Sequence, residues 1–201
     1  REELSMKPVT VITGSMAPLP RANVDTDQIM PKQFLKRVER TGYGQYVFDD
    51  WRRDEDDFVL ERPEYRNARV LVTGPNFGSG SSREHAPWGL QDWGFEAVIA
   101  PSFADIFFNN CTKIGLVPVV LSEKEVRWLT ELADADPDAE ITIDIAARTV
   151  SHGTEFEATF PLDDFTQYRI LNGLDDIGIT LQHADAIDEF EQRRPAFKPV
   201  L

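Results

Sequence analysis

The sequence has very little cysteine, with Cys111 alone among 201 residues. A single thiol cannot close an intramolecular disulfide, and it cannot supply the several thiolates that an iron–sulfur cluster or a structural zinc site requires. The sequence therefore excludes a disulfide-stapled fold and favours a reducing compartment, the cytoplasm. We expect Cys111 itself to be a small, buried side chain on a helix.

Long apolar runs and an excess of positive charge are also absent. No stretch approaches the roughly 20 apolar residues that cross a bilayer, and residues 1–5 lack the apolar core of a signal peptide. With 21 basic and 35 acidic side chains, the net charge of −14 repels nucleic acid and anionic lipid. Neither is therefore expected as a partner. The acidic cluster at residues 54–57 is typical of a solvated surface.

The central part of the chain alternates short apolar segments with helical patterns. Three β-branched, apolar segments predict strands: residues 70–72, 97–100 and 116–121. Two segments between them predict helices, residues 83–93 and 103–114, the second with Phe103, Ile106, Phe107 and Ile114 on its buried face. A capping box at Ser122 and Glu125 begins a further helix. This alternation predicts a parallel sheet with right-handed crossovers.

The two ends of the chain follow other patterns. Residues 9–12 predict a strand, and a proline-containing loop is expected at 14–20. Alternating apolar residues at 141–145 and 156–160 predict antiparallel strands with a turn at His152 and Gly153 between them. The last part, residues 165–193, is typical of helices with breaks at Gly173 and Gly178. The sequence thus predicts an α/β fold with a mixed, partly parallel sheet.

Residues 74–86 lie between a predicted strand and a predicted helix, where open α/β sheets bind ligands. Three common motifs do not fit this segment. Arg83 replaces the third glycine of a dinucleotide fingerprint, no lysine completes a phosphate-binding loop, and the serines lack the glycines of a nucleophile elbow. A glycine-rich turn followed by hydroxyls and a guanidinium suits a small carboxylate or phosphate. The same residues also fit a structural turn in which Ser82 caps the helix.

Several segments resemble one family. Residues 78–86, Gly-Ser-Gly-Ser-Ser-Arg-Glu-His-Ala, are similar to the signature of the swivelling domain of aconitase-type hydro-lyases, and residues 21–29, Arg-Ala-Asn-Val-Asp-Thr-Asp-Gln-Ile, resemble its N-terminal companion. Residues 34–42 and 173–177 resemble the stand-alone version, the small subunit of 3-isopropylmalate dehydratase. This resemblance covers essentially the entire chain. It implies one swivelling β/β/α domain over residues 1–201, similar to the aconitase C-terminal domain.

The resemblance also implies an activity and a partner. The enzyme would interconvert 2-isopropylmalate and 3-isopropylmalate by dehydration and rehydration, in leucine biosynthesis. The chain would act as a heterodimer with an isopropylmalate dehydratase large subunit that carries a [4Fe-4S] cluster, and would itself hold no metal or cofactor. The substrate would be a small dicarboxylate or tricarboxylate. Related hydro-lyases of homoaconitate or of methylmalate and citraconate, a non-catalytic carboxylate-binding module and a serine hydrolase are the alternatives.

The resemblance assigns roles to individual residues as well. In the aconitase relatives the first serine of the pair is the catalytic base, which implies that role for Ser81. Ser82 and Arg83 match ligands of the substrate carboxylate, and Arg21 matches a further substrate-binding arginine. Removing a proton beside a carboxylate builds up negative charge, so such a site needs cations. Further candidates for a supporting role are Arg40, Thr41 and His85, and we interpret His85 as a residue that orients the loop. Residues 34–42 are expected to form the pocket for the substrate's variable group.

Overall fold

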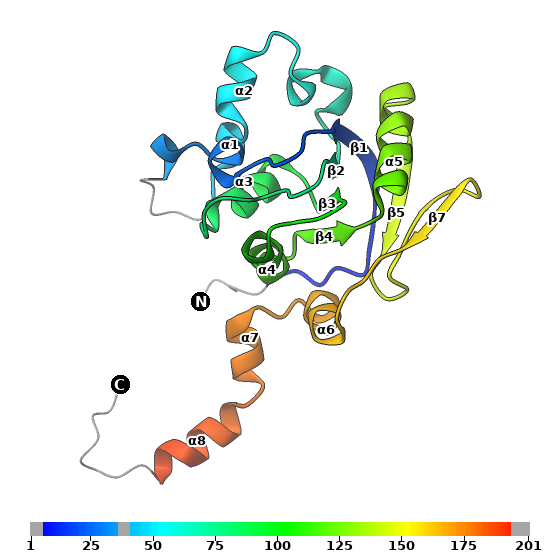
Figure 1. Ribbon diagram of the computed structural model, residues 1–201. Helices are drawn as coiled ribbons and strands as arrows, with labels where there is room; N and C mark the ends of the chain where they lie inside the picture. Colours follow the sequence, from blue (N-terminus) through cyan, green and yellow to red (C-terminus); the bar gives the residue numbers. More distant parts are fainter. Residues whose placement is uncertain (1–5, 36–40, 194–201) are drawn as a thin grey trace.

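The computed structural model describes residues 6–35 and 41–193, and within them seven strands form one sheet in the order β4-β3-β2-β1-β5-β6-β7 (Figure 1). Strands β1 to β4 run parallel to one another, and β5, β6 and β7 extend the sheet beyond β1 in antiparallel fashion. The prediction of a mixed, partly parallel sheet is therefore confirmed. The strands are β1 (Val11–Leu19), β2 (Val70–Thr73), β3 (Ala97–Ala100), β4 (Val117–Val120), β5 (Glu140–Asp144), β6 (Thr149–His152) and β7 (Phe156–Thr159).

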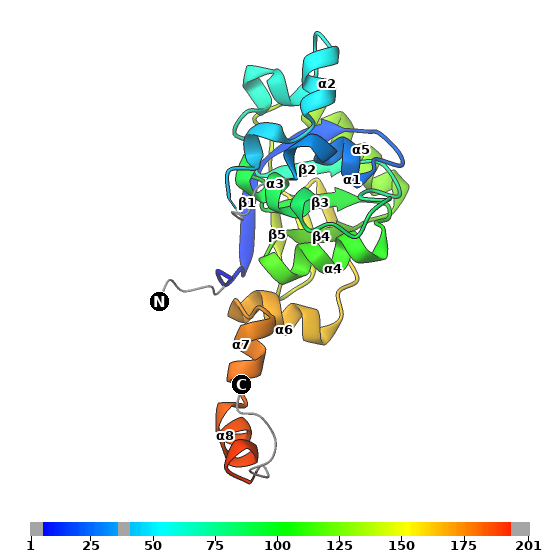
Figure 2. The ribbon, with the colours of Figure 1, turned by 90° about the vertical axis from the view of Figure 1, so that its left-hand side faces the viewer.

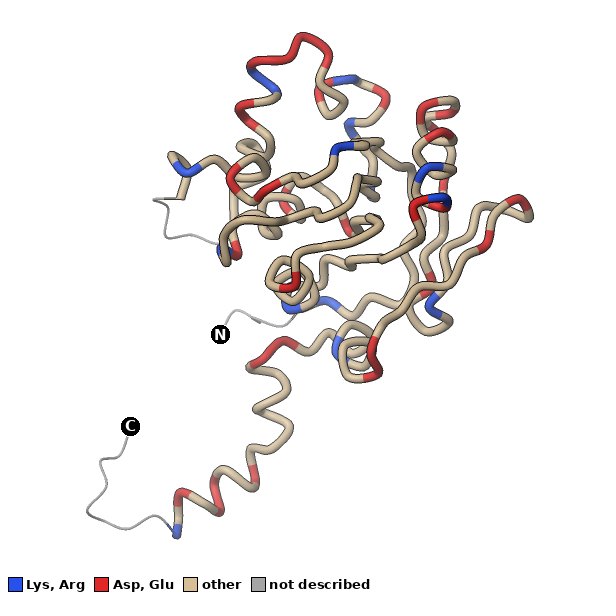
Figure 3. The backbone as a smooth tube through the Cα atoms, viewed as in Figure 1, with Lys and Arg blue, Asp and Glu red and all other residues tan. Residues whose placement is uncertain are grey.

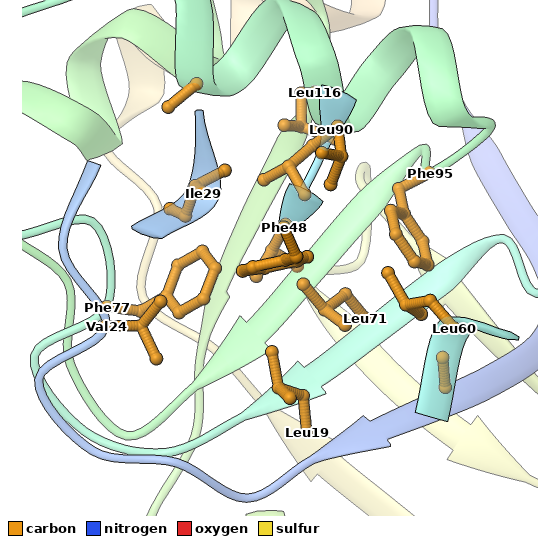
Figure 4. Close-up of a cluster of buried hydrophobic side chains, with 14 of the residues drawn as sticks. Leu19, Val24, Ile29, Phe48, Leu60, Leu71, Phe77, Leu90, Phe95 and Leu116 are labelled. Atoms are coloured by element: carbon orange, nitrogen blue, oxygen red, sulfur yellow. The ribbon is translucent and has the colours of Figure 1, made fainter. Parts of the chain in front are cut away.

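Helices cover both faces of the parallel half. One face buries side chains of the helices that precede β4, and the other packs against α5, whose predicted capping box is present. Figure 4 shows the first of these cores, where Leu71 of β2 lies among aromatic and aliphatic side chains. The helices are α1 (Thr26–Ile29), α2 (Asp49–Asp54), α3 (His85–Trp93), α4 (Asp105–Ile114), α5 (Glu123–Ala135), α6 (Asp164–Asn172), α7 (Asp176–Leu181) and α8 (Ala184–Gln192). Short 3₁₀ turns occupy Lys32–Phe34, Gly44–Tyr46, Val59–Glu61 and Pro63–Tyr65.

Strand β1 is longer than predicted, because it continues through the segment expected to be a loop. Its first half pairs with β5 as far as Ser15, and its second half pairs with β2 from Met16 onward. Pro18 lies beyond Ser15, the last residue of β1 that pairs with β5. No described strand therefore requires a hydrogen bond from Pro18 on the β5 side of β1. The strand's exchange of partners, which local sequence does not reveal, permits a proline near the centre of the sheet.

The C-terminal half corrects three further expectations. Strand β6 was not predicted, because Val150 is the only fully buried side chain in it. Gly173 ends α6 in a left-handed conformation, as expected, whereas Gly178 lies inside α7, since its N–H is bound by the capping side chain of Asp175 at 2.6 Å. On α4, Ile106 is 52% exposed and does not belong to the buried face.

The N-terminal segment meets the end of α6, where the Val9 N–H donates to the Ile170 carbonyl at 3.0 Å. Beyond this point α7 and α8 lead away from the sheet in both views (Figures 1 and 2). Within the described residues, no helix combines the length and the apolar character needed to cross a membrane.

Candidate functional site

The glycine-rich segment forms the connection between β2 and α3. Gly78 has a positive φ of +76°, and a Cβ atom at this position would lie 2.1 Å from Cγ of Phe107, so only glycine fits there. The Gly78 N–H donates to the Val24 carbonyl at 2.8 Å. This contact holds the loop against the segment that follows β1.

Helix α3 begins later than predicted, at His85, and its N-cap residue is Glu84 with no capping side chain. The expected helix start near Arg83 and the alternative in which Ser82 caps the helix are therefore both wrong. Ser81, Ser82 and Arg83 lie in the loop that leads into the helix, where their side chains are not constrained by helical geometry. Ser82 is exposed, and its carbonyl accepts a bond from Asn110 Nδ2 at 3.3 Å.

The start of α1 meets this loop, although the two segments are far apart in sequence. The Ser81 N–H donates to Thr26 Oγ1 at 3.1 Å, across a separation of 55 residues, and the Thr26 N–H donates to the Ser79 carbonyl at 2.8 Å. Asp25 caps α1 and forms a capping box with Gln28. The structure thus brings residues 21–29 and 78–86, the two segments with the most specific resemblance, into contact.

The Ser81 hydroxyl accepts two hydrogen bonds from Arg83. The guanidinium Nε donates to Ser81 Oγ at 2.6 Å, and the backbone N–H of Arg83 donates to the same oxygen at 3.3 Å. Arg83 Nη2 also pairs with Asp27 Oδ1 at 2.5 Å, while Lys32 Nζ lies 3.0 Å from the other oxygen of that carboxylate. A cationic donor 2.6 Å from a serine oxygen stabilises negative charge on that oxygen.

His85 lies beside this network as the first residue of α3. Its ring packs edge-on against Tyr43, with centroids 5.2 Å apart, and lies 4.9 Å from the ring of Trp88. Burial, and then the positive charge of Arg83, lower the pKa of the His85 imidazole below its usual value. These contacts hold the ring beside the loop, and the role of His85 in orienting that loop stays a prediction.

In the described part of the chain, the Arg21 side chain interacts with Glu55 and Trp51 and not with the Ser81 loop. Its guanidinium makes two hydrogen bonds to Glu55, at 2.8 and 2.5 Å, and lies 4.4 Å from the ring centroid of Trp51. The hydrogen bonds raise the pKa of Arg21 and lower that of Glu55. Among the interactions of the described residues, none joins Arg21 to Ser81 or Arg83. Glu55 belongs to the acidic cluster expected to be merely solvated, so this part of the cluster has a specific partner instead.

Two of the residues predicted to have a supporting role, Arg40 and Thr41, lie within or next to residues 36–40, which the structure does not describe. Arg40 falls outside the described residues. Thr41 is exposed and precedes Tyr43, whose ring reaches His85. The expectation for residues 34–42 as a pocket therefore stays a prediction.

Sequence reasoning did not identify Asp27 and Lys32 as partners of the site. Both charges extend the network from Arg83, one through an ion pair and the other through the shared carboxylate. Asp27 stands in the segment with family resemblance, so a signal existed for its importance. Nothing in the sequence pointed to Arg83 as its partner.

The described residues contain no group of three or more histidine, cysteine, aspartate or glutamate side chains placed to hold a metal ion. Cys111 is fully buried on α4, as predicted, and burial raises the pKa of its thiol well above the usual value. A buried thiol of this kind is not a ligand for a cluster at the Ser81 loop.

Comparisons with known proteins identify the family to which the chain belongs. Residues 6–124 match the family described as the aconitase C-terminal domain, and residues 176–201 match the C-terminal domain of the 3-isopropylmalate dehydratase small subunit. The chain is 55% identical over 194 residues to the 3-isopropylmalate dehydratase small subunit of Rubrobacter xylanophilus, a match that covers 96% of this chain and 98% of the relative. It is 49% identical over 203 residues to the corresponding protein of Leptospira interrogans, with 98% of each covered.

A solved structure supports the same assignment. The crystal structure of 3-isopropylmalate dehydratase (leuD) from Methanocaldococcus jannaschii superposes with a TM-score of 0.62 at 25% identity, and covers 90% of this chain and 99% of that one. The sequence and fold comparisons thus converge. The chain belongs to the family of 3-isopropylmalate dehydratase small subunits and has the fold of the aconitase C-terminal domain.

Proposed function

We propose that this chain is the small subunit of a 3-isopropylmalate dehydratase, which interconverts 2-isopropylmalate and 3-isopropylmalate in leucine biosynthesis together with a large subunit. The observation that carries the proposal is the Ser81 hydroxyl, which accepts from the Arg83 guanidinium at 2.6 Å within a glycine-rich loop. Family membership supports the substrate class, and this geometry supports Ser81 as the base for the reaction.

In this proposal Ser81 gives up its hydroxyl proton to solvent, and the resulting alkoxide oxygen takes the proton from the carbon beside a substrate carboxylate and becomes the hydroxyl again. The electron pair of the broken C–H bond forms the double bond as the hydroxyl leaves the neighbouring carbon. A serine hydroxyl acts as a base at neutral pH only when its alkoxide is strongly stabilised. The Nε–H and the backbone N–H of Arg83 both donate to that oxygen, and they remain in place when it becomes negative.

Arg83 also provides a place for the substrate carboxylate. Its Nη2 is paired with Asp27, so a carboxylate that binds there competes with Asp27. Because Lys32 holds the other oxygen of Asp27, the displaced carboxylate keeps a cationic partner. The exposed Ser82 beside it is the second proposed ligand of the substrate. Arg21 belongs to the proposed site only if its contact with Glu55 opens.

The [4Fe-4S] cluster expected of an aconitase relative does not fit the residues of this chain. The lone cysteine is buried in the core, and the described part of the chain offers no cluster of metal-binding side chains near Ser81. We therefore assign the cluster, which supplies a Lewis acid for the leaving hydroxyl, to the large subunit. We further propose that residues 1–201 act as one swivelling domain that closes over it.

The test is an activity assay of the two-subunit complex. The purified chain is mixed under anaerobic conditions with the cluster-loaded large subunit of the same organism, and turnover is measured with 2-isopropylmalate, homoaconitate and citraconate. We expect turnover of 2-isopropylmalate to exceed that of the others. Preference for another substrate would assign the chain to a related hydro-lyase. Tight binding of isopropylmalate by the isolated chain, with no turnover in the complex, would instead indicate a carboxylate-binding module.

Replacing Ser81 tests the assigned base. In the Ser81→Ala complex we expect kcat to fall by about 10²- to 10⁴-fold, the usual contribution of a positioned base. Sedimentation should show unchanged association with the large subunit. Ser151→Ala, on strand β6, is the matched control and should keep full activity. Full activity of Ser81→Ala would remove Ser81 from the mechanism.

A further inference from the structure

The C-terminal arm, defined here as helices α7 and α8, has an exposed apolar surface that the proposed chemistry does not use. Every residue from 180 to 193 is exposed. Four large apolar side chains of the arm are accessible to solvent: Ile177 (56% exposed), Leu181 (64%), Ile187 (38%) and Phe190 (64%). In both views the arm leads away from the sheet rather than folding back on it (Figures 1 and 2).

The base of the arm is fixed to the domain, whereas its outer part has few contacts. Asp176 pairs with Arg169 of α6 at 2.8 Å and with Lys113 of α4 at 3.6 Å, and Asp175 caps α7. The two helices are only 6 and 9 residues long. Helices shorter than about 12 residues are marginal in water unless an apolar face packs against another surface. Ile187 and Phe190 are three residues apart and so share one face of α8, which needs such a surface.

The charges of α8 limit what this surface can be. The helix carries Asp185, Asp188, Glu189 and Glu191, and only Glu189 is paired within the described residues, with Arg193 at 3.0 Å. Acidic residues line the outer helix in Figure 3. A second copy of this arm would bring acidic helices together in a protein whose net charge is already −14. The complementary partner is a protein groove with an apolar floor and a rim of lysine or arginine.

The family match gives the reason to choose one partner for this surface. Residues 176–201 match the C-terminal domain of 3-isopropylmalate dehydratase small subunits, separately from the aconitase domain at residues 6–124. A catalytic domain on its own chain needs an interface in place of a covalent link. We propose that the C-terminal arm docks in an apolar, basic-rimmed groove of the large subunit and anchors the two chains together. This inference rests on the proposed function for the existence of that subunit.

The test measures the affinity of the two subunits with and without the apolar face of the arm. The variant is Ile187→Ser combined with Phe190→Ser. Val11→Ser is the matched control, because this apolar residue on β1 has an exposure (49%) between those of Ile187 and Phe190. We expect the arm variant to weaken binding at least about tenfold, as truncation of central apolar contacts does, and the control to bind like the wild type. At saturating large subunit the arm variant should recover wild-type kcat, because the arm carries none of the proposed site residues.

A charge-reversed variant, Asp188→Lys with Glu191→Lys, tests the basic rim. Binding of the wild type should weaken as ionic strength rises, and the variant should bind more weakly and lose that dependence. Two results would overturn the inference: an active wild-type complex with an arm variant of unchanged affinity, or an arm variant that loses only self-association of the isolated chain. If the wild type shows no activity with the large subunit, the proposed function itself is contradicted, and this outcome is distinguishable from both.

Discussion

At the scale of single residues, Asp27 divides its two carboxylate oxygens between two cations, Arg83 at 2.5 Å and Lys32 at 3.0 Å. Arg83 in turn uses different nitrogens for Asp27 and for Ser81. The serine hydroxyl is thereby held by a guanidinium whose own orientation is fixed from the other side. A chain of charge-assisted contacts of this kind limits the rotamers of each member and prepares the hydroxyl for its proposed role.

His85 carries a residue-scale prediction about pH. Its folded-state pKa lies below the ordinary value of 6.5, because burial and Arg83 disfavour the imidazolium. Below pH 6.5 the unfolded chain binds a proton that the folded chain does not. The free energy of unfolding should therefore decrease as the pH falls from 6.5 toward the pKa of His85 in the folded chain. Below that pKa, His85 should make no further contribution to the pH dependence. In His85→Gln this part of the pH dependence should disappear.

Urea denaturation of the isolated chain between about pH 8 and pH 5 measures this effect, with His152→Gln, at the last residue of β6, as the control. Equal pH dependence in the wild type and in His85→Gln would show that the His85 pKa is not lowered by folding.

The sequence could identify Ser81 and Arg83 because they stand close together in one distinctive motif. It could not identify their network, because the contact between Asp27 and Arg83 depends on the packing of α1 against the loop, where Thr26 bonds to Ser79 and Ser81. The ion pair between Arg21 and Glu55 could not be predicted for the same reason, because Glu55 is one of several acidic residues in a run that is typical of a solvated surface. A residue's type is local information, whereas its partner depends on the fold.

At the scale of elements, the loop between β2 and α3 owes its path to Gly78. The side chain of Phe107 on α4 occupies the space where a Cβ atom would lie. The loop is therefore clamped between α4 and the segment after β1, from which the Gly78 N–H receives its partner. This close approach places the Ser81 region against α1.

Gly78→Ala should destabilise the isolated chain by about 3 kcal/mol or more, because a left-handed φ and a steric clash combine. Gly153→Ala is the matched control: it also has a positive φ, of +52°, but nothing lies within 4 Å of the added Cβ. The control should lose only about 1 kcal/mol, the cost of the conformation alone. Urea denaturation compares the two variants. Equal losses would mean that the loop moves away from Phe107 without cost.

Elements with strong local signals were predictable, and those defined by their neighbours were not. Strand β3 and the capped start of α5 agree with the prediction to the residue, because a β-branched run and a capping box are complete within a few positions. The sequence predicts only the first part of strand β1, because the continuation of the strand depends on pairing with β2. Strand β6 has one buried side chain, Val150, and three partly buried ones, so it depends on pairing with β5 and β7 rather than on an apolar pattern.

At the scale of the whole molecule, one sheet separates two buried clusters and belongs to both. Val70 and Val72 of β2 face one cluster, while Leu71 between them faces the other. A substitution that weakens the packing of either cluster therefore also affects strands on which the other cluster packs. This arrangement supports the proposal that the chain acts as a single domain.

Leu90→Ala, on α3, and Ile143→Ala, on β5, test that proposal, because each removes a fully buried side chain from a different cluster. Each should lower the free energy of unfolding by about 2–5 kcal/mol, and both should shift one common transition. Circular dichroism follows the whole chain, and tryptophan fluorescence reports both sides, since Trp93 packs on one cluster and Trp128 on the other. Two separated transitions would divide the chain into two units.

The burial of Cys111 makes this protein convenient for site-specific labelling. Its thiol has no exposed surface and a raised pKa, so almost no thiolate is present to react with a maleimide in the folded state. Because no other cysteine occurs in the sequence, a cysteine introduced on the surface becomes the single reactive position. A fluorophore at Glu191, for example, would report on the arm alone, with no need to remove a native thiol first.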